Sequence, residues 1–170
     1  MVKSVVRSDL KKSTRELLTT ISNFPEEYFN THAKEGRWTA GQIAEHLIKV
    51  ETGTVHFFTG ETEPTDRDPL QKISKVKERL LNDDLRMNAN EPIIPDDKPK
   101  DKESVLKKLQ DIRQRLISLV EIEDLTELIS SFAHPLFGPM TRVEWIYFNI
   151  LHSRRHIRQS RDLEKIFSEK

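Results

Sequence analysis

Two histidines four residues apart stand in the segment LHSRRHIRQ, residues 151–159. In a helix, the rotation of about 100° per residue places His152 and His156 about 40° apart on one face, one turn above the other. Neutral imidazoles in this arrangement can bind one divalent metal ion together. They can also form a hydrogen-bonded pair in the core, because each ring has a donor and an acceptor nitrogen. The spacing by itself leaves both interpretations open.

A third histidine lies in RWTAGQIAEHLIKVE, residues 37–51. The same count places His46 on one helix face with Ile43, Val50 and Phe57, so its ring is expected to point into the protein. If the two helices are neighbours in a bundle, His46 joins the pair as a third nitrogen ligand. Three protein ligands with an open position are typical of catalytic rather than structural metal sites. A lone core histidine is the alternative interpretation of His46.

Capping boxes indicate where the two histidine-bearing helices begin. Thr39 is followed three residues later by Gln42, and Thr141 is followed at the same spacing by Glu144. In this arrangement each side chain hydrogen-bonds the other residue's backbone N–H, which has no partner in the first turn of a helix. The predicted helices are 39–58 and 141–166.

Apolar residues at steps of three and four predict the remaining helices. The predicted helical segments are 8–29 with a break at Pro25, part of 69–87, 102–122 and a short segment at 124–133. Proline, glycine and charged residues predict loops at 59–68, 88–101 and 134–140. The loop at 88–101 contains three prolines and is interpreted as a surface crossover.

Composition favours one helical domain that covers residues 1–170. Charged residues make up 33% of the chain and hydrophobic residues 35%, with only five glycines, which suits amphipathic helices with solvated outer faces. A chain of 170 residues is long enough for one sizeable core and short for two. We predict an all-α fold, a four-helix bundle with short additional helical segments and a longer crossover loop.

Charge and hydropathy argue against two classes of partner. Lysine plus arginine and aspartate plus glutamate both number 28, so no net field attracts a polyanion, and no nucleic-acid partner is expected. The first residues lack the apolar core of a signal peptide, and no apolar run reaches about 18 residues. We therefore expect a cytoplasmic protein without membrane contact. The chain has no cysteine, which leaves histidine and carboxylate as the expected metal ligands.

Both histidine segments resemble one known family. RWTAGQIAEHLIKVE and HPLFGPMTRVEWIYFNILHSRRHIRQ are similar to the DinB superfamily, in the branch of the YfiT-type proteins. The shared pattern is a tryptophan, threonine, glutamine and histidine on the second helix, then an H-P-x-x-G loop and H-x-x-x-H-x-x-Q on the last helix. The resemblance implies a bundle that binds zinc or nickel, with His46, His152 and His156 as ligands. Residues expected around such a centre are Gln42, His134, Asn149, Arg155 and Gln159.

The surrounding residues also have structural interpretations. Gln42 and Gln159 are candidates to hydrogen-bond a metal ligand or a bound water. Gln42 also belongs to a capping box, Gln159 can pack against the bundle, and His134 can orient the turn at Pro135. Arg155 lies at the edge of the histidine face, where it can serve either a substrate or the fold.

The resemblance implies a metal-dependent enzyme with a small-molecule substrate, either a thiol S-transferase that uses a low-molecular-weight thiol or a hydrolase. No H-E-x-x-H motif is present, so no general base is evident. The alternative is a non-catalytic, stress-related bundle that binds metal or a small ligand. A mixed apolar and basic face opposite the histidines on the last helix is either a seam in the bundle core or the interface of a homodimer. Its residues are Val143, Tyr147, Ile150, Arg154, Ile157, Arg158 and Arg161.

Overall fold

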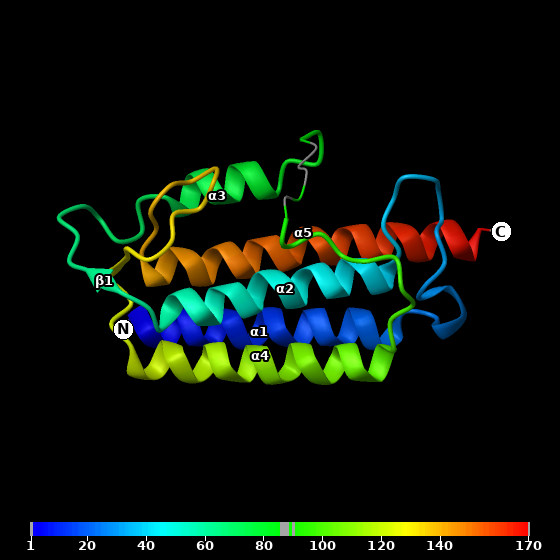
Figure 1. Cartoon of the computed structure of the whole chain (residues 1–170), viewed down its shortest axis with the longest axis horizontal. Helices are drawn as coiled ribbons and strands as arrows, with labels where there is room; N and C mark the ends of the chain where they lie inside the picture. The colour runs from blue at the N-terminus through cyan, green and yellow to red at the C-terminus, as the bar shows by residue number, and fades with distance from the viewer. Residues whose placement is uncertain (1, 86–88, 90, 170) are drawn as a thin grey trace.

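Four long helices form the body of the structure, a computed structural model that describes residues 2–85, 89 and 91–169. The long helices are α1 (Val2–Asn23), α2 (Ala40–Phe58), α4 (Lys102–Ile122) and α5 (Arg142–Ser168). The packed pairs are α1 with α4, α1 with α5, α2 with α4 and α2 with α5. α1 and α5 run in one direction along the bundle, and α2 and α4 run in the other (Figure 1). The predicted helical class and four-helix bundle are confirmed.

Both predicted capping boxes are present. The Thr39 hydroxyl accepts from the Gln42 N–H at 3.1 Å, and the Gln42 side-chain oxygen accepts from the Thr39 N–H at 3.0 Å. Thr141 and Glu144 exchange the equivalent bonds at 3.3 and 2.9 Å. α2 and α5 therefore begin where the sequence predicts, because local side chains satisfy the first N–H groups of each helix.

α1 starts earlier than the predicted helix 8–29 and ends at the predicted break near Pro25. It starts at Val2, and Val6 is buried against the bundle, which extends the packed face one turn before the predicted start. It ends at Asn23, because Pro25 has no N–H and disfavours the helical conformation in the residue before it. Glu26–Tyr28 then forms a separate 3-10 turn.

α3 (Ile73–Leu80) is shorter than the helix predicted within 69–87 and packs on α5 (Figure 1). The last residues of that prediction, 86–87, lie outside the described part of the chain. The guanidinium of Arg155 donates to the backbone oxygens of Leu80, Asn82 and Leu85 at 2.7 to 3.1 Å. A cation from α5 therefore satisfies carbonyl groups at and beyond the end of α3.

The short helix predicted at 124–133 is wrong. Leu128–Ile129 is instead a strand, β2, that pairs antiparallel with β1 (Thr62–Glu63), so β1 lies within the predicted loop 59–68. The backbone N–H of Ile129 donates to Met140 O at 3.0 Å, and the Ile129 side chain is fully buried. Backbone groups of β2 that would bond within a helix thus bond to β1 and Met140 instead. Tertiary contacts override the local apolar pattern.

The core has two hydrophobic layers along the bundle axis with buried polar side chains between them. One layer includes Val6, Leu10, Phe58, Leu116, Leu119 and Ile146. The other includes Leu17, Ile21, Ile43, Leu47, Leu109 and Leu163. The intervening polar layer contains Ser13, Glu51, Arg113, His152 and Ser153. The bundle therefore holds polar groups at mid-height, where each of them needs a partner.

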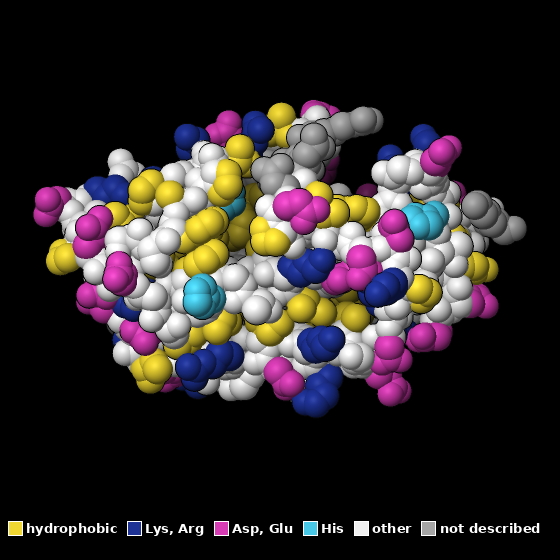
Figure 2. Space-filling model, viewed as in Figure 1, with side chains coloured by type: hydrophobic (Ala, Val, Ile, Leu, Met, Phe, Trp, Pro, Cys, Tyr) yellow, Lys and Arg dark blue, Asp and Glu magenta, His cyan; other side chains and the backbone are white. Residues whose placement is uncertain are grey.

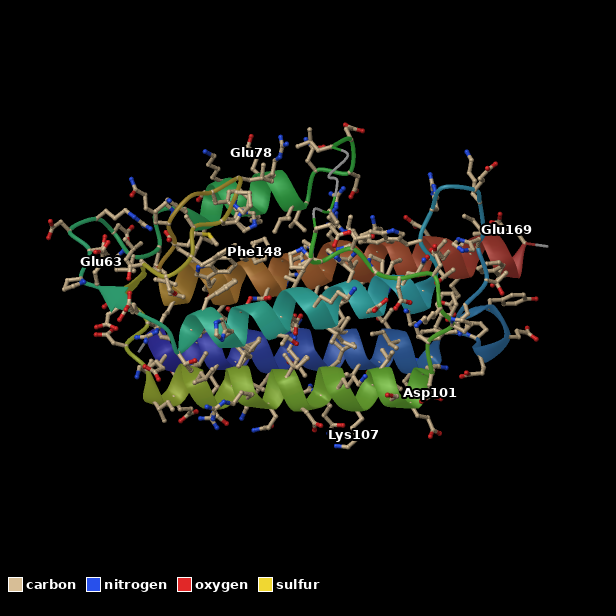
Figure 3. All side chains as sticks on the ribbon, viewed as in Figure 1. Glu63, Glu78, Asp101, Lys107, Phe148 and Glu169 are labelled. Atoms are coloured by element: carbon tan, nitrogen blue, oxygen red, sulfur yellow. The ribbon has the colours of Figure 1, made fainter. Side chains whose placement is uncertain are left out.

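Residues 93–100, called the strap below, form the part of the predicted crossover loop that lies along α2. Hydrogen bonds fasten the strap to one face of that helix. The α2 residues that make these bonds are Gln42, Glu45, His46 and Lys49. Figure 3 shows the side chains of this region on the ribbon, with Asp101 labelled at the point where the crossover meets α4. Within the described ranges, no helix is both long and apolar enough to cross a membrane.

Candidate metal centre

The three predicted histidines meet in the interior of the bundle. His46 comes from α2, and His152 and His156 come from successive turns of α5. Nε2 of His152 lies 3.3 Å from Nε2 of His46 and 3.0 Å from Nε2 of His156. A tetrahedral zinc ion with Zn–N bonds of about 2.0–2.1 Å would hold its nitrogens roughly 3.3 Å apart. The spacing of the Nε2 atoms is therefore close to that required around one divalent ion.

The outer nitrogens of two rings are held by hydrogen-bond acceptors. Nδ1–H of His46 donates to the backbone oxygen of Ile93 in the strap at 2.8 Å. Nδ1–H of His156 donates to Oε1 of Gln159 at 2.6 Å. Because these acceptors keep the proton on Nδ1, the Nε2 atoms of both rings present lone pairs to the centre.

The protons available to the three facing nitrogens are too few. With His46 and His156 protonated on Nδ1, only His152 can bring a proton on its Nε2, and that proton can serve one neighbour at a time. The Nε2 lone pair of the other neighbour is then left without a donor. If His152 carries the proton there, its Nδ1, which has no hydrogen-bond partner, is a buried unsatisfied acceptor. A divalent cation would accept all three lone pairs, so the residues present fit such an ion.

Burial keeps these imidazoles neutral. Loss of hydration lowers the pKa of His46, lowers that of His156 to about 3 and holds that of His152 well below its ordinary value of 6.5. Neighbouring positive charge acts in the same direction, from Lys49 on His46 and from Arg155 on His152. Neutral imidazole is the form that binds metal, so the cluster is in its ligating form at neutral pH.

Aromatic rings pack on both sides of the cluster. The ring of Trp38 lies 5.0 Å from that of His46, and Phe148 stacks on His152 at 5.3 Å with the two planes only 11° apart. These contacts restrict the tilt of the imidazoles and shield their faces from water. Trp38 is the tryptophan of the family pattern, and Phe148 lies four residues before His152 on the same helix face.

Two of the predicted surrounding residues serve the bundle. Gln42 caps α2 with its oxygen, and its amide nitrogen donates to the strap at Asp96 O and Asp97 Oδ1. Asn149 donates to Thr54 of α2 at 3.0 Å and to the backbone of its own helix. Gln42 therefore holds the strap, and Asn149 ties α5 to α2.

The other predicted neighbours divide between the centre and the fold. Gln159 supports His156 directly. Arg155 binds backbone oxygens at the end of α3, a contact that belongs to the fold. His134 is separated from His152 by Phe148, since its ring lies 4.8 Å from that of Phe148, which in turn stacks on His152. His32 and His56 are exposed.

A buried ion pair beside the cluster went unnoticed in the sequence. Glu51 of α2 binds Arg113 of α4 through both carboxylate oxygens, and Arg113 also donates to Ser13 of α1, which contacts Ser153 of α5. The sequence does indicate a buried charge here, because Arg113 stands four residues after Leu109 on the apolar stripe of its helix. A charge on a buried stripe requires a partner. Glu51 is thus committed to Arg113.

The face of α5 opposite the histidines is a seam in the bundle. Val143, Ile150 and Ile157 are buried, and α1 packs on α5. Tyr147 donates to Asp9 of α1 at 2.9 Å. Of the two predicted interpretations of this face, contact with another helix of the same chain accounts for its apolar residues.

Comparisons with known proteins agree with this fold. Residues 9–160 match the model of the DinB superfamily. YfiT from Bacillus subtilis, "a probable metal-dependent hydrolase with an unusual four-helix bundle topology", is 20% identical with a TM-score of 0.64, over 98% of this chain and 87% of YfiT. TT2238, "a four-helix bundle protein", is 19% identical with a TM-score of 0.60, over 94% of this chain and 98% of TT2238. At these identities the likeness shows a shared fold.

A search of the curated proteins finds no significant match. The match to the family model covers most of the chain and includes all three histidines of the cluster. The protein therefore belongs to the DinB superfamily.

Proposed function

We propose that the protein is a metal-dependent enzyme whose divalent ion is held by His46, His152 and His156. The observation that carries the proposal is the convergence of three buried Nε2 atoms that have too few protons to satisfy one another. Zinc and nickel are the metals proposed, because imidazole nitrogen suits both and the chain offers no thiolate.

The ligand set determines what such an ion can do. With three uncharged nitrogen ligands it keeps its full positive charge, so it would acidify a bound water or thiol and polarise a carbonyl oxygen. Within the described residues, no carboxylate belongs to the cluster. The surrounding groups act on the ligands instead: Ile93 O and Gln159 fix the protons of His46 and His156 on Nδ1.

Two reaction types use this chemistry. In hydrolysis, water adds to an acyl or similar centre, whose leaving group departs with a proton. In thiol transfer, a low-molecular-weight thiol loses its proton and its sulfur bonds to carbon as the leaving group departs. The likeness to YfiT supports hydrolysis, and the absence of cysteine means that a thiol would come from a cosubstrate. A non-catalytic metal-binding bundle is the remaining candidate.

Metal content tests the centre. Tag-free protein loaded with zinc should retain about one ion per chain after gel filtration, and His152→Ala should lose it, because two nitrogens do not replace three. His56→Ala removes an exposed histidine outside the cluster and should keep the ion. Undiminished stoichiometric zinc in both His152→Ala and His46→Ala would contradict the proposal.

Turnover separates an enzyme from a binding module. The zinc-loaded and nickel-loaded proteins should hydrolyse one of a panel of activated esters and amides, or conjugate one of several low-molecular-weight thiols to a generic electrophile. The rate should fall to background in His152→Ala and remain in His56→Ala. If every reaction proceeds at the same rate with wild type and His152→Ala, the protein is a binding module.

A further inference from the structure

Six aromatic rings form one connected group beside the metal centre. This group, called the aromatic cluster below, comprises Phe57 of α2, Phe132, His134 and Phe137 of the segment before α5, and Trp145 and Phe148 of α5. Phe57 stacks on Phe132 at 4.0 Å, and both rings contact Trp145. Phe148 contacts Trp145 at 5.5 Å and stacks on the ligand His152. The aromatic cluster therefore adjoins the metal centre through a single ring.

The surface is hollowed in the same region. Figure 2 shows a depression walled by hydrophobic side chains, with a histidine visible within it. It lies over the first turns of α5, near the position where Figure 3 labels Phe148. The outer rings of the aromatic cluster, Phe57, Phe132 and His134, are only half-buried, so this end of the aromatic cluster reaches the surface.

Two hydrogen-bond donors belong to the aromatic cluster. Trp145 is only 2% exposed, and its indole Nε1–H is buried without a hydrogen-bond partner. A buried N–H left unpaired costs about 1–3 kcal/mol, so it calls for a functional explanation. The His134 ring accepts the Leu136 N–H at Nδ1, which leaves its proton on Nε2 as a second donor.

The cations of this region are already engaged. Lys72 donates to the backbone oxygens of Phe137 and Pro139, and Arg155 donates to the end of α3. Burial also lowers the pKa of His134 to about 4, so its ring is neutral at pH 7. The binding surface therefore combines apolar rings with uncharged donors.

We propose that the aromatic cluster binds the substrate of the metal centre, and that this substrate is an uncharged molecule with an apolar, ring-sized body and a hydrogen-bond acceptor oxygen. The inference rests on the proposed function, because it places the substrate beside the ion. The rings bury the body of the molecule, and the Trp145 N–H binds its oxygen. Aryl ketones and aryl esters have this chemistry, because the aromatic cluster offers apolar rings and uncharged donors.

Nitrogen-15 NMR of the full zinc-loaded chain tests the inference, with acetophenone as the probe. The chain has two tryptophans, Trp38 and Trp145. The indole N–H signal of Trp145 should move downfield and saturate, and that of Trp38 should move little. Ethylbenzene has a similar ring without the acceptor oxygen and should bind about fivefold to tenfold more weakly.

Two variants with a matched control complete the test. Trp145→Phe keeps a ring and removes the N–H, and should weaken acetophenone binding about fivefold to tenfold, as expected for one buried hydrogen bond. Phe132→Leu at the half-buried rim should weaken it similarly. Tyr28→Leu breaks a different stacked pair, with Phe167, and should leave binding unchanged. Zinc content and thermal unfolding check that each variant folds.

The outcomes distinguish this inference from the function on which it rests. If zinc binds through the three histidines but acetophenone causes no saturable shift of the Trp145 signal, the substrate class is wrong and the metal centre stands. Equal acetophenone affinity in wild type, Trp145→Phe and Phe132→Leu would also overturn it. If the three histidines bind no zinc at all, both proposals are wrong.

Discussion

At the scale of single residues, the candidate centre depends on which nitrogen of each imidazole carries the proton. The strap carbonyl of Ile93 and the side chain of Gln159 decide this for His46 and His156. Such acceptors orient a ligand and raise its basicity, and their removal typically costs about 10–100-fold in metal affinity. His152 has no equivalent acceptor at Nδ1, and stacking on Phe148 positions its ring instead.

Replacing Gln159 should weaken the metal site without unfolding the chain. Gln159→Ala removes the acceptor for His156 Nδ1–H, so zinc affinity in competition with a chelating dye should fall by about 10–100-fold. Because Gln159 is exposed, the thermal midpoint of the metal-free variant should match that of wild type. Gln159→Glu retains an acceptor and should bind zinc at least as tightly as wild type. Unchanged affinity in Gln159→Ala would show that the bond is irrelevant to the ligand.

The metal-free protein should lose stability as the pH falls from about 7 to about 5. The folded-state pKa of His156 is lowered to about 3, below its ordinary value of 6.5, so the unfolded chain binds more protons between these values. The free energy of unfolding therefore rises with pH in this range, by at most about 1.4 kcal/mol per unit for each such histidine.

Urea denaturation at pH 5, 6 and 7 measures this dependence. A His156→Gln variant lacks the titrating ring and should show a smaller change in the free energy of unfolding over the same range. His32→Gln, which alters an exposed ring, should follow wild type. An identical slope in all three proteins would contradict the assignment.

At the scale of elements, α5 organises the molecule through several faces. One face carries the histidines, another packs on α1, and Arg155 binds the end of α3. The first turn is fixed by the Thr141 capping box, in which Glu144 also binds Arg67 from the segment before α3. The same helix therefore determines both the ligand geometry and the position of the elements next to it.

Removing the guanidinium of Arg155 should loosen α3 and leave the metal site intact. Arg155→Gln deletes three hydrogen bonds to backbone oxygens near Leu80, so amide hydrogens of α3 should exchange faster. Zinc affinity should stay within about twofold, because Arg155 contacts no ligand atom in the described contacts. Arg154→Gln changes an exposed arginine on the same helix and serves as the control. A large loss of zinc affinity with unchanged exchange in α3 would instead support a role at the centre.

At the scale of the whole molecule, the polar layer joins all four long helices. Glu51, Arg113, Ser13 and Ser153 each come from a different helix and form one hydrogen-bonded chain. Removal of one partner from a buried ion pair leaves an uncompensated charge, whereas replacement of both by apolar residues is often neutral. The polar layer thus restricts which helices can pack together and how they are aligned along the bundle axis.

Variants of the ion pair should show this asymmetry. Arg113→Ala and Glu51→Ala should each lower the free energy of unfolding by about 3–5 kcal/mol, measured by urea denaturation. The double variant Arg113→Met with Glu51→Leu should be markedly more stable than either single variant. Lys107→Ala breaks an exposed pair with Asp111 and should change stability by less than about 1 kcal/mol. A double variant as unstable as the singles would contradict the explanation.

The sequence by itself determined the features that depend on near neighbours along the chain. The capping boxes gave the starts of α2 and α5, the apolar stripe gave α4, and helical periodicity placed His152 and His156 on one face. The inward orientation of His46 follows from the same periodicity. These inferences hold because cap hydrogen bonds and helix faces are set within one or two turns.

Only the tertiary structure decided which distant groups share an environment. It paired 128–129 with 62–63 against the local helical pattern, gave Arg155 to the end of α3, and joined Glu51 to Arg113 across the bundle. It also brought Ile93 of the strap to His46. A backbone oxygen or a ring in a loop has no periodic signature, so its position depends on how the elements pack. The three candidate ligands could be predicted from the sequence, but the acceptors and rings around them required the fold.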